Sequence, residues 1–118
     1  MSYERLLPAA AVLAATIVAA GCGGTKTSAP VATTQVQMVK SYRFDPSSIR
    51  VKAGDTVTWT NNDNFTHSVR LLDGGEVQMM KPGESVSLDF STPGLFRYDC
   101  SLHPKDMKGS VLVESGAA

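Results

Sequence analysis

From Thr34 onward, apolar and polar residues alternate in short runs, and this period of two limits the possible folds more than any other feature. Val57 and Trp59 alternate with threonines, and the run 85–90 has the same pattern. Turn-forming residues such as Lys81-Pro82-Gly83 separate the runs. No helical period is sustained in this region. Six or more short strands at regular spacing predict an all-β fold, an antiparallel Greek-key sandwich.

Composition and charge exclude several classes of protein. A chain of 118 residues allows one domain of ordinary size. The 11 basic and 11 acidic residues give a formal net charge of zero, which argues against nucleic acid as a partner. The apolar content of 42% suffices for a packed core, and two cysteines are too few for a disulfide scaffold.

The N-terminal segment is typical of an export signal. Residues 6–20 are almost all apolar, and this run is shorter than the roughly 20 residues that a membrane-spanning helix needs. The small residues before Cys22 resemble a bacterial lipobox, in which the cysteine is lipidated and becomes the mature N-terminus. The alternative is an ordinary secretory signal beside an incidental Cys22. Both interpretations predict an exported protein.

The remaining chain divides into two parts after the signal peptide of residues 1–21. Residues 22–33 are small and polar and predict a flexible tether, and residues 34–118 form the folded domain. A lipidated Cys22 would anchor this domain to a membrane, because two acyl chains give stable attachment. Cys100 is then the only thiol in the folded domain, so it cannot form an internal disulfide.

Four side chains with soft or borderline metal-binding atoms occur in a suggestive order. Cys100 shares a strand face with Tyr98 and therefore points inward, and His103 follows three positions later. His67 precedes them, and Met107 lies four residues beyond His103. Two histidines and a cysteine with a weak axial methionine are typical of a type 1 copper site. Taken singly, each residue would more simply be a core, surface or hydrogen-bonded residue.

The same residues lie in segments that resemble the cupredoxins, most closely the small plastocyanin-, pseudoazurin- and amicyanin-like proteins. The resemblance covers residues 36–114, with segments 62–67, 98–104 and 107–113 matching the two ligand loops and the final strand. It implies a cupredoxin-like fold, one type 1 copper ion per chain and one-electron transfer. Three residues separate His103 from Met107, and this spacing differs from the spacing in the loops of those relatives. A backbone oxygen is therefore the alternative axial ligand.

Neighbouring residues have supporting roles in this interpretation. Ser68 and Ser101 each follow a ligand, and a hydrogen bond between them would join the two loops; ordinary turn serines are the alternative. The resemblance implies that Leu102, Pro104 and Phe65 form an apolar docking patch around His103. Core packing is the favoured role of Met79 and Met80.

These observations predict an electron carrier tethered on the periplasmic side of a bacterial cell envelope. Its partners would be redox proteins: a c-type cytochrome, another cuproprotein or a respiratory complex. An enzymatic role is not expected, because both histidines belong to one centre. The alternative is a module for copper sequestration or delivery, for which only Met38, Met79 and Met80 offer a hint of further Cu(I) sites. A metal-free sandwich would leave the ligand set unexplained.

Overall fold

The computed structural model describes residues 29–116, which form ten β-strands without any α-helix. Accordingly, within this range no helix is long and apolar enough to cross a membrane. The strands in chain order are β1 (Val31–Ala32), β2 (Gln35–Val39), β3 (Arg43–Asp45), β4 (Ser48–Lys52), β5 (Asp55–Asn61), β6 (His67–Leu71), β7 (Val77–Met80), β8 (Ser85–Phe90), β9 (Gly94–Asp99) and β10 (Lys108–Glu114).

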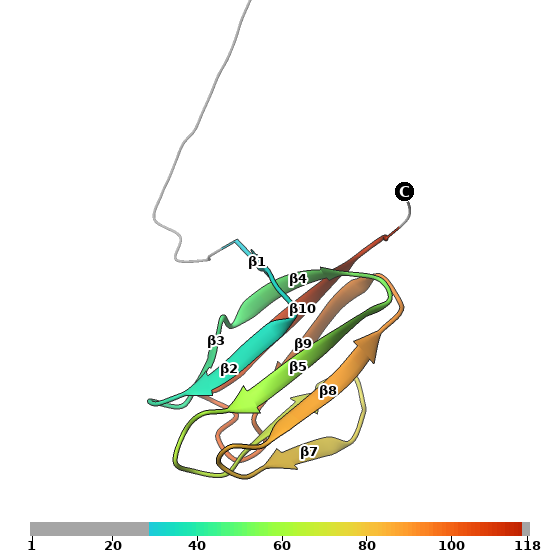
Figure 1. Cartoon of the computed structure of the whole chain (residues 1–118). Coiled ribbons are helices and arrows are strands. Elements are labelled where there is room, and N and C mark those ends of the chain that lie inside the picture. The colour runs from blue at the N-terminus through green and yellow to red at the C-terminus, as the bar shows by residue number, and fades with distance from the viewer. Residues whose placement is uncertain (1–28, 117–118) are drawn as a thin grey trace, which may run out of the picture.

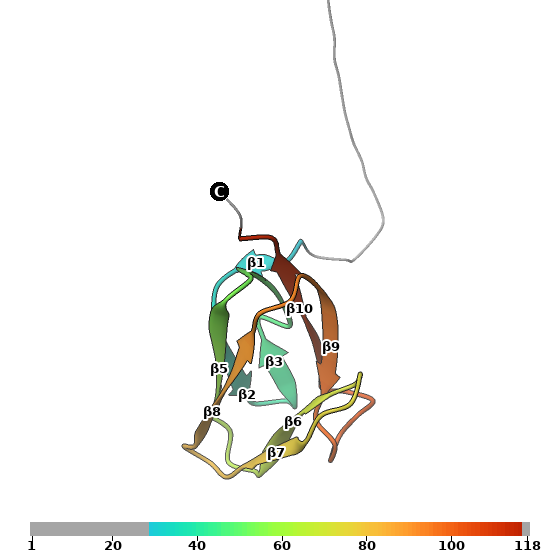
Figure 2. The ribbon, with the colours of Figure 1, turned by 90° about the vertical axis from the view of Figure 1, so that its right-hand side faces the viewer.

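The strands form two sheets that face each other (Figure 2). One has the order β1-β4-β10-β9-β6-β7 and the other β3-β2-β5-β8. The predicted all-β sandwich is confirmed, but its sheets are mixed and not wholly antiparallel. β4 pairs in parallel with β10 and β1, and β2 pairs in parallel with β5. An alternating pattern shows which face of a strand is buried, and it carries no information on strand direction.

Aromatic side chains fill the core between the sheets. Trp59 and Tyr98 are fully buried, and their ring centroids lie 5.2 Å apart in an edge-to-face arrangement. Phe44 also packs edge-to-face on Tyr98, with ring centroids 4.8 Å apart. Gly109 on β10 faces this cluster and leaves room for the Tyr98 ring. The alternating residues of the sequence therefore bury a continuous apolar layer that fixes β9, the strand that leads to Cys100.

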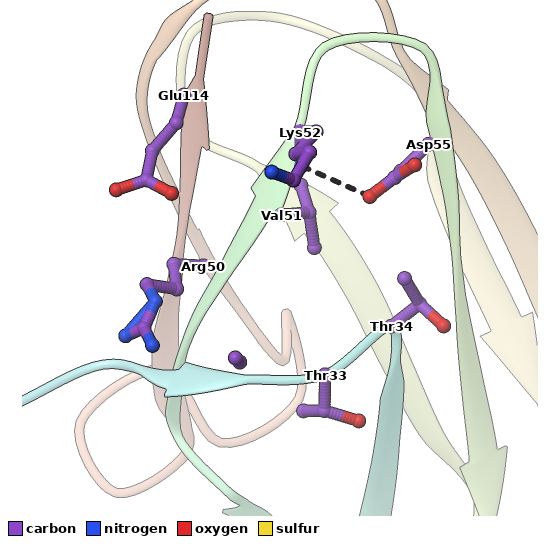
Figure 3. A pocket seen from close by; sticks show the side chains of 8 residues that line it. Thr33, Thr34, Arg50, Val51, Lys52, Asp55 and Glu114 are labelled. Atoms are coloured by element: carbon purple, nitrogen blue, oxygen red, sulfur yellow. Dashed lines mark hydrogen bonds between the residues drawn. The ribbon is translucent and has the colours of Figure 1, made fainter. Parts of the chain in front are cut away.

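The loops that carry the candidate ligands lie at one end of the sandwich (Figure 1). The β2–β3, β5–β6 and β9–β10 connections meet there, whereas β1 and the end of β10 lie at the opposite end. The hollow shown in Figure 3 belongs to this opposite end. Arg50 and Lys52 line it together with Asp55 and Glu114, so its charges balance, and it takes no part in the ligand cluster.

The first strand begins within the segment that was predicted to be a tether. Val31 and Ala32, which were expected in the tether, form β1 and pair with Ile49 and Arg50 of β4. The reason is that β4 would otherwise be the edge of its sheet, and two residues of extended chain satisfy its free backbone groups. Cys22 and the predicted signal peptide lie outside the described residues.

Candidate metal centre

Three side chains from two loops converge at the end of the sandwich. His67 begins β6, Cys100 follows the last residue of β9, and His103 lies in the β9–β10 loop. Their ligand atoms all lie within 4.8 Å of one another. The Cys100 sulfur is 4.0 Å from Nδ1 of His67 and 3.9 Å from Nδ1 of His103. Both imidazoles therefore direct the same ring nitrogen toward the thiol.

The burial of these groups defines the chemistry of the cluster. His67 and Cys100 are fully buried, and His103 is only partly covered. Two imidazoles and a thiol form a donor set of mixed softness that is typical of a type 1 copper site. No acidic side chain belongs to the cluster, so it is unsuited to a hard cation such as Mg²⁺. The residues present therefore fit one copper ion.

The β9–β10 loop is closed by its own backbone hydrogen bonds. The amide of His103 donates to the carbonyl of Cys100 at 3.1 Å, and the amide of Met107 donates to the carbonyl of His103 at 2.9 Å. The amide of Cys100 in turn donates to the carbonyl of Met107 at 3.0 Å. Met107 is fully buried in the core cluster that also contains Cys100. The three-residue spacing between His103 and Met107 thus still brings Met107 back to the strand end that carries the thiol.

A buried carboxylate holds His67 from the side away from the thiol. Oδ2 of Asp63 lies 2.8 Å from Nε2 of His67. The hydrogen bond from the imidazole lowers the pKa of Asp63, opposed in part by burial. With Nε2 as donor, Nδ1 is the unprotonated nitrogen that faces the cluster. Asp63 is not among the site residues predicted from the sequence, although its position four residues before His67 in a turn was the available signal.

Asn61 fixes the loop in which Asp63 lies. Its side-chain amide donates to the backbone carbonyls of Phe65 and Met80, at 2.8 and 2.9 Å. Its side-chain oxygen accepts the amide of Asp63 at 2.9 Å. Asn61 is fully buried, and every polar group of its side chain is paired. The β5–β6 loop is therefore a rigid support for His67.

Ser68 and Ser101 join the two ligand loops, which is one of the two roles that their sequence positions left open. Their hydroxyl oxygens lie 2.9 Å apart, and the amide of Ser101 donates to the Ser68 hydroxyl at 2.7 Å. The Ser68 hydroxyl also donates to the Cys100 sulfur at 3.7 Å. One side chain thus ties the loops together and supplies a hydrogen bond to the thiol.

The surface beside His103 is apolar. Phe65 and Leu102 are 57% and 49% exposed, and Pro104 is exposed as well. The two methionines behave differently from each other: Met80 is buried as expected, whereas Met79 is 54% exposed. The expectation of core packing is therefore wrong for Met79, because alternation along β7 turns it outward when Met80 turns inward.

Comparisons with known proteins agree with this geometry. A model of the cupredoxin-like domain matches residues 10–113. The amicyanin-alpha of Methylorubrum extorquens is 37% identical over 120 residues, which cover 93% of this chain and 99% of that protein. The plastocyanin of Scenedesmus fuscus is 39% identical over 85 residues, 60% of this chain and 86% of that protein.

A solved structure shows the same likeness. A Cu(I) form of an amicyanin variant superposes with a TM-score of 0.63 at 32% sequence identity, covering 68% of this chain and 80% of the amicyanin. The domain model spans most of the chain, and a curated relative matches along nearly its whole length. Fold, family match and ligand cluster agree, and the chain belongs to the cupredoxin family.

Proposed function

We propose that this protein is an electron carrier with one type 1 copper ion as its cofactor. The observation that carries the proposal is the convergence of His67, Cys100 and His103, whose ligand atoms all lie within 4.8 Å of one another. The Nδ1 atoms of the two histidines lie 4.0 and 3.9 Å from the Cys100 sulfur. In this proposal the Cys100 sulfur and the Nδ1 atoms of both histidines would hold the copper, together with the thioether of Met107. The likeness to amicyanin and plastocyanin supports it.

The residues around the cluster suit electron transfer because they resist movement. Bound copper supplies a one-electron couple between Cu(II) and Cu(I). The thiolate of Cys100 is a soft ligand and the imidazoles are of intermediate softness, so one ligand set serves both oxidation states. Asp63 fixes His67, and the closed β9–β10 loop fixes His103 and Met107. Little rearrangement would then accompany each electron.

Electrons would enter and leave through His103. Its side chain is the only one of the three ligand candidates that is not fully buried. Phe65, Leu102 and Pro104 surround it with apolar surface, on which a redox protein would dock. The candidate partners are a c-type cytochrome, another cuproprotein or a respiratory complex. Zero net charge argues against strong long-range steering of such a partner.

We also propose that the protein is exported and attached to a membrane of the cell envelope through lipid on Cys22. The basis is the lipobox-like sequence and the small, polar residues that follow it. Fractionation of cells that express the full-length protein tests this. The wild type should be found with membranes and Cys22→Ser should not, and equal distribution of both would contradict the anchor.

A copper-delivery role has less support than electron transfer. Two of the three methionines that suggested further Cu(I) sites, Met38 and Met80, are buried in the core. The histidines that a multicopper enzyme would need for a further centre are also lacking, because the sequence has only two histidines and both belong to the cluster. A second copper centre with histidine ligands is therefore not available.

Repeated redox cycling in the presence of a Cu(I) chelator separates the carrier from the delivery module. The copper-loaded protein is reduced and reoxidised many times, and the protein-bound copper is measured after each cycle. A carrier retains its copper and passes one electron per cycle to a cytochrome c used as acceptor. Transfer of the copper to the chelator on the first reduction would contradict the proposal. Cys100→Ser is the control, since it removes the thiolate.

A further inference from the structure

The β2–β3 turn brings the aromatic ring of Tyr42 against the ligand cluster. Nothing in the sequence indicates that this residue contacts the two histidines. Tyr42 lies in this turn, and its ring centroid is 4.4 Å from that of His103, with an angle of 41° between the planes. The same ring meets His67 at 5.8 Å and 88°. One side chain therefore contacts both histidines of the cluster, from a loop that contributes no ligand.

Phe65 extends this contact on the outer side. Its ring lies 6.0 Å from that of Tyr42, with 28° between the planes. Phe65 belongs to the β5–β6 loop and His103 to the β9–β10 loop, so Tyr42 packs between two loops that carry the candidate ligands. His103 is partly covered, and part of that cover is the Tyr42 ring. Without the ring, this imidazole would have more contact with water and fewer packing neighbours.

The backbone of the turn is specialised for this placement. Ser41 and Tyr42 have φ angles of 76° and 57°, in the left-handed region that bulky residues rarely adopt. Two such residues in succession persist only where surrounding contacts stabilise them. For Tyr42 the contacts that the structure shows are made by its ring, with Phe65, His67 and His103. A phenylalanine should therefore serve as well as the tyrosine.

We propose that Tyr42 is a positioning residue of the metal centre, whose ring fixes the imidazole plane of His103 against that of His67. The inference rests on the ligand set of the proposed function. His103 needs this support more than His67 does, because Asp63 already holds His67 by a hydrogen bond. Among the described residues, the contacts recorded for the His103 ring are those with the Cys100 sulfur, Tyr42 and His67.

Two substitutions and one matched control test the proposal in the full-length protein. Tyr42→Phe keeps the ring, and Tyr42→Leu removes it while keeping an apolar side chain. Phe96→Leu removes a half-buried aromatic ring whose ring contact, among the described residues, is with Phe90 at a centroid distance of 5.5 Å and not with either histidine. This control reports the general loss of packing that any such substitution causes.

The first measurement uses the copper-free protein and does not depend on electron transfer. The ring current of Tyr42 should displace the NMR resonances of the His103 ring protons. This displacement should persist in Tyr42→Phe and Phe96→Leu and disappear in Tyr42→Leu. Unchanged His103 resonances in Tyr42→Leu would overturn the proposal.

The second measurement is copper affinity by competition with a chelator. Residues that orient metal ligands typically change affinity by about 10–100-fold, so Tyr42→Leu should bind about tenfold more weakly than wild type. Tyr42→Phe and Phe96→Leu should bind like wild type. Equal affinity of Tyr42→Leu and Phe96→Leu, at equal loss of thermal stability, would show a merely structural role and overturn the proposal.

The proposed function and this inference fail in different ways. A wild-type protein that binds copper but passes no electrons to a partner contradicts the carrier, and the dependence of the His103 resonances on the ring would still support the role of Tyr42. If the wild type is redox-active and Tyr42→Leu keeps the wild-type His103 resonances and copper affinity, only the proposed role of Tyr42 is contradicted.

Discussion

The carboxylate of Asp63 accepts a hydrogen bond from Nε2 of His67 over 2.8 Å, and both side chains are buried. This single contact selects the tautomer in which Nδ1 of His67 is free to face Cys100. It also places a negative charge beside the metal centre, where a low dielectric strengthens its effect. Asp63 is therefore both a mechanical support and an electrostatic one.

Replacing Asp63 by asparagine should weaken the binding of Cu(II) by about tenfold, the lower end of the range for residues that orient metal ligands. The negative charge of Asp63 stabilises the more positive Cu(II) form over Cu(I). Its removal should therefore raise the reduction potential, by tens of millivolts. Voltammetry and chelator competition measure the two effects. A potential equal to or below that of wild type would contradict the role of the charge.

Ser68→Ala should lower the reduction potential, because a hydrogen bond to the Cys100 sulfur withdraws electron density from the ligand that stabilises Cu(II). It should also reduce the free energy of unfolding by about 1–3 kcal/mol, since the amide of Ser101 loses its partner. Ser87→Ala is the matched control, because it removes an exposed hydroxyl pair with Thr58 at 2.8 Å in the other sheet. An equal potential for wild type and Ser68→Ala would show that the sulfur contact has no electronic effect.

Met107→Leu separates the two candidates for the axial ligand. The buried side chain is replaced by one of similar volume, so the loss of stability should stay below about 1.5 kcal/mol. If the thioether is the axial ligand, the protein should remain coloured and its potential should rise. An unchanged potential and spectrum would favour a backbone oxygen in that position.

Gly109→Ala should destabilise the fold by about 2–3 kcal/mol, the upper part of the usual cost of overpacking. A Cβ atom at this position would collide with the Tyr98 ring and approach the carbonyl oxygen of Ser47 to 2.6 Å. Gly54→Ala provides the comparison, because its φ of 100° is unfavourable but its surroundings are open. Chemical denaturation measures both variants, and a smaller loss for Gly109→Ala than for Gly54→Ala would contradict the packing argument.

Much of the centre was predictable because the alternation along a strand determines to which face of the sheet each side chain points. The alternation of β9 pointed Cys100 inward, and adjacency to the ligands suggested Ser68 and Ser101. Asp63 was not predicted, because an acidic residue in a turn rich in asparagine resembles a solvated one. Its burial depends on Asn61 and on the tertiary position of His67.

The remaining differences arise from contacts between segments distant in the sequence. Tyr42 reaches the histidines only because its turn adopts left-handed backbone angles, which no local pattern indicates for a tyrosine. The pairing of Val31 and Ala32 with β4 likewise depends on a free sheet edge. Local propensity carries little information on either feature, because the first depends on contacts with the two histidines and the second on pairing with β4.

The central claim is that Cys100 and the two histidines form a type 1 copper site. Its most direct test is the visible absorption spectrum of the purified protein after one equivalent of Cu(II), followed by ascorbate and reoxidation. An intense thiolate-to-copper band that bleaches on reduction and returns on reoxidation is the expected result, and Cys100→Ser should lack it. A pale, weakly absorbing complex in the wild type would show that no Cu(II)–thiolate bond forms and would contradict the account.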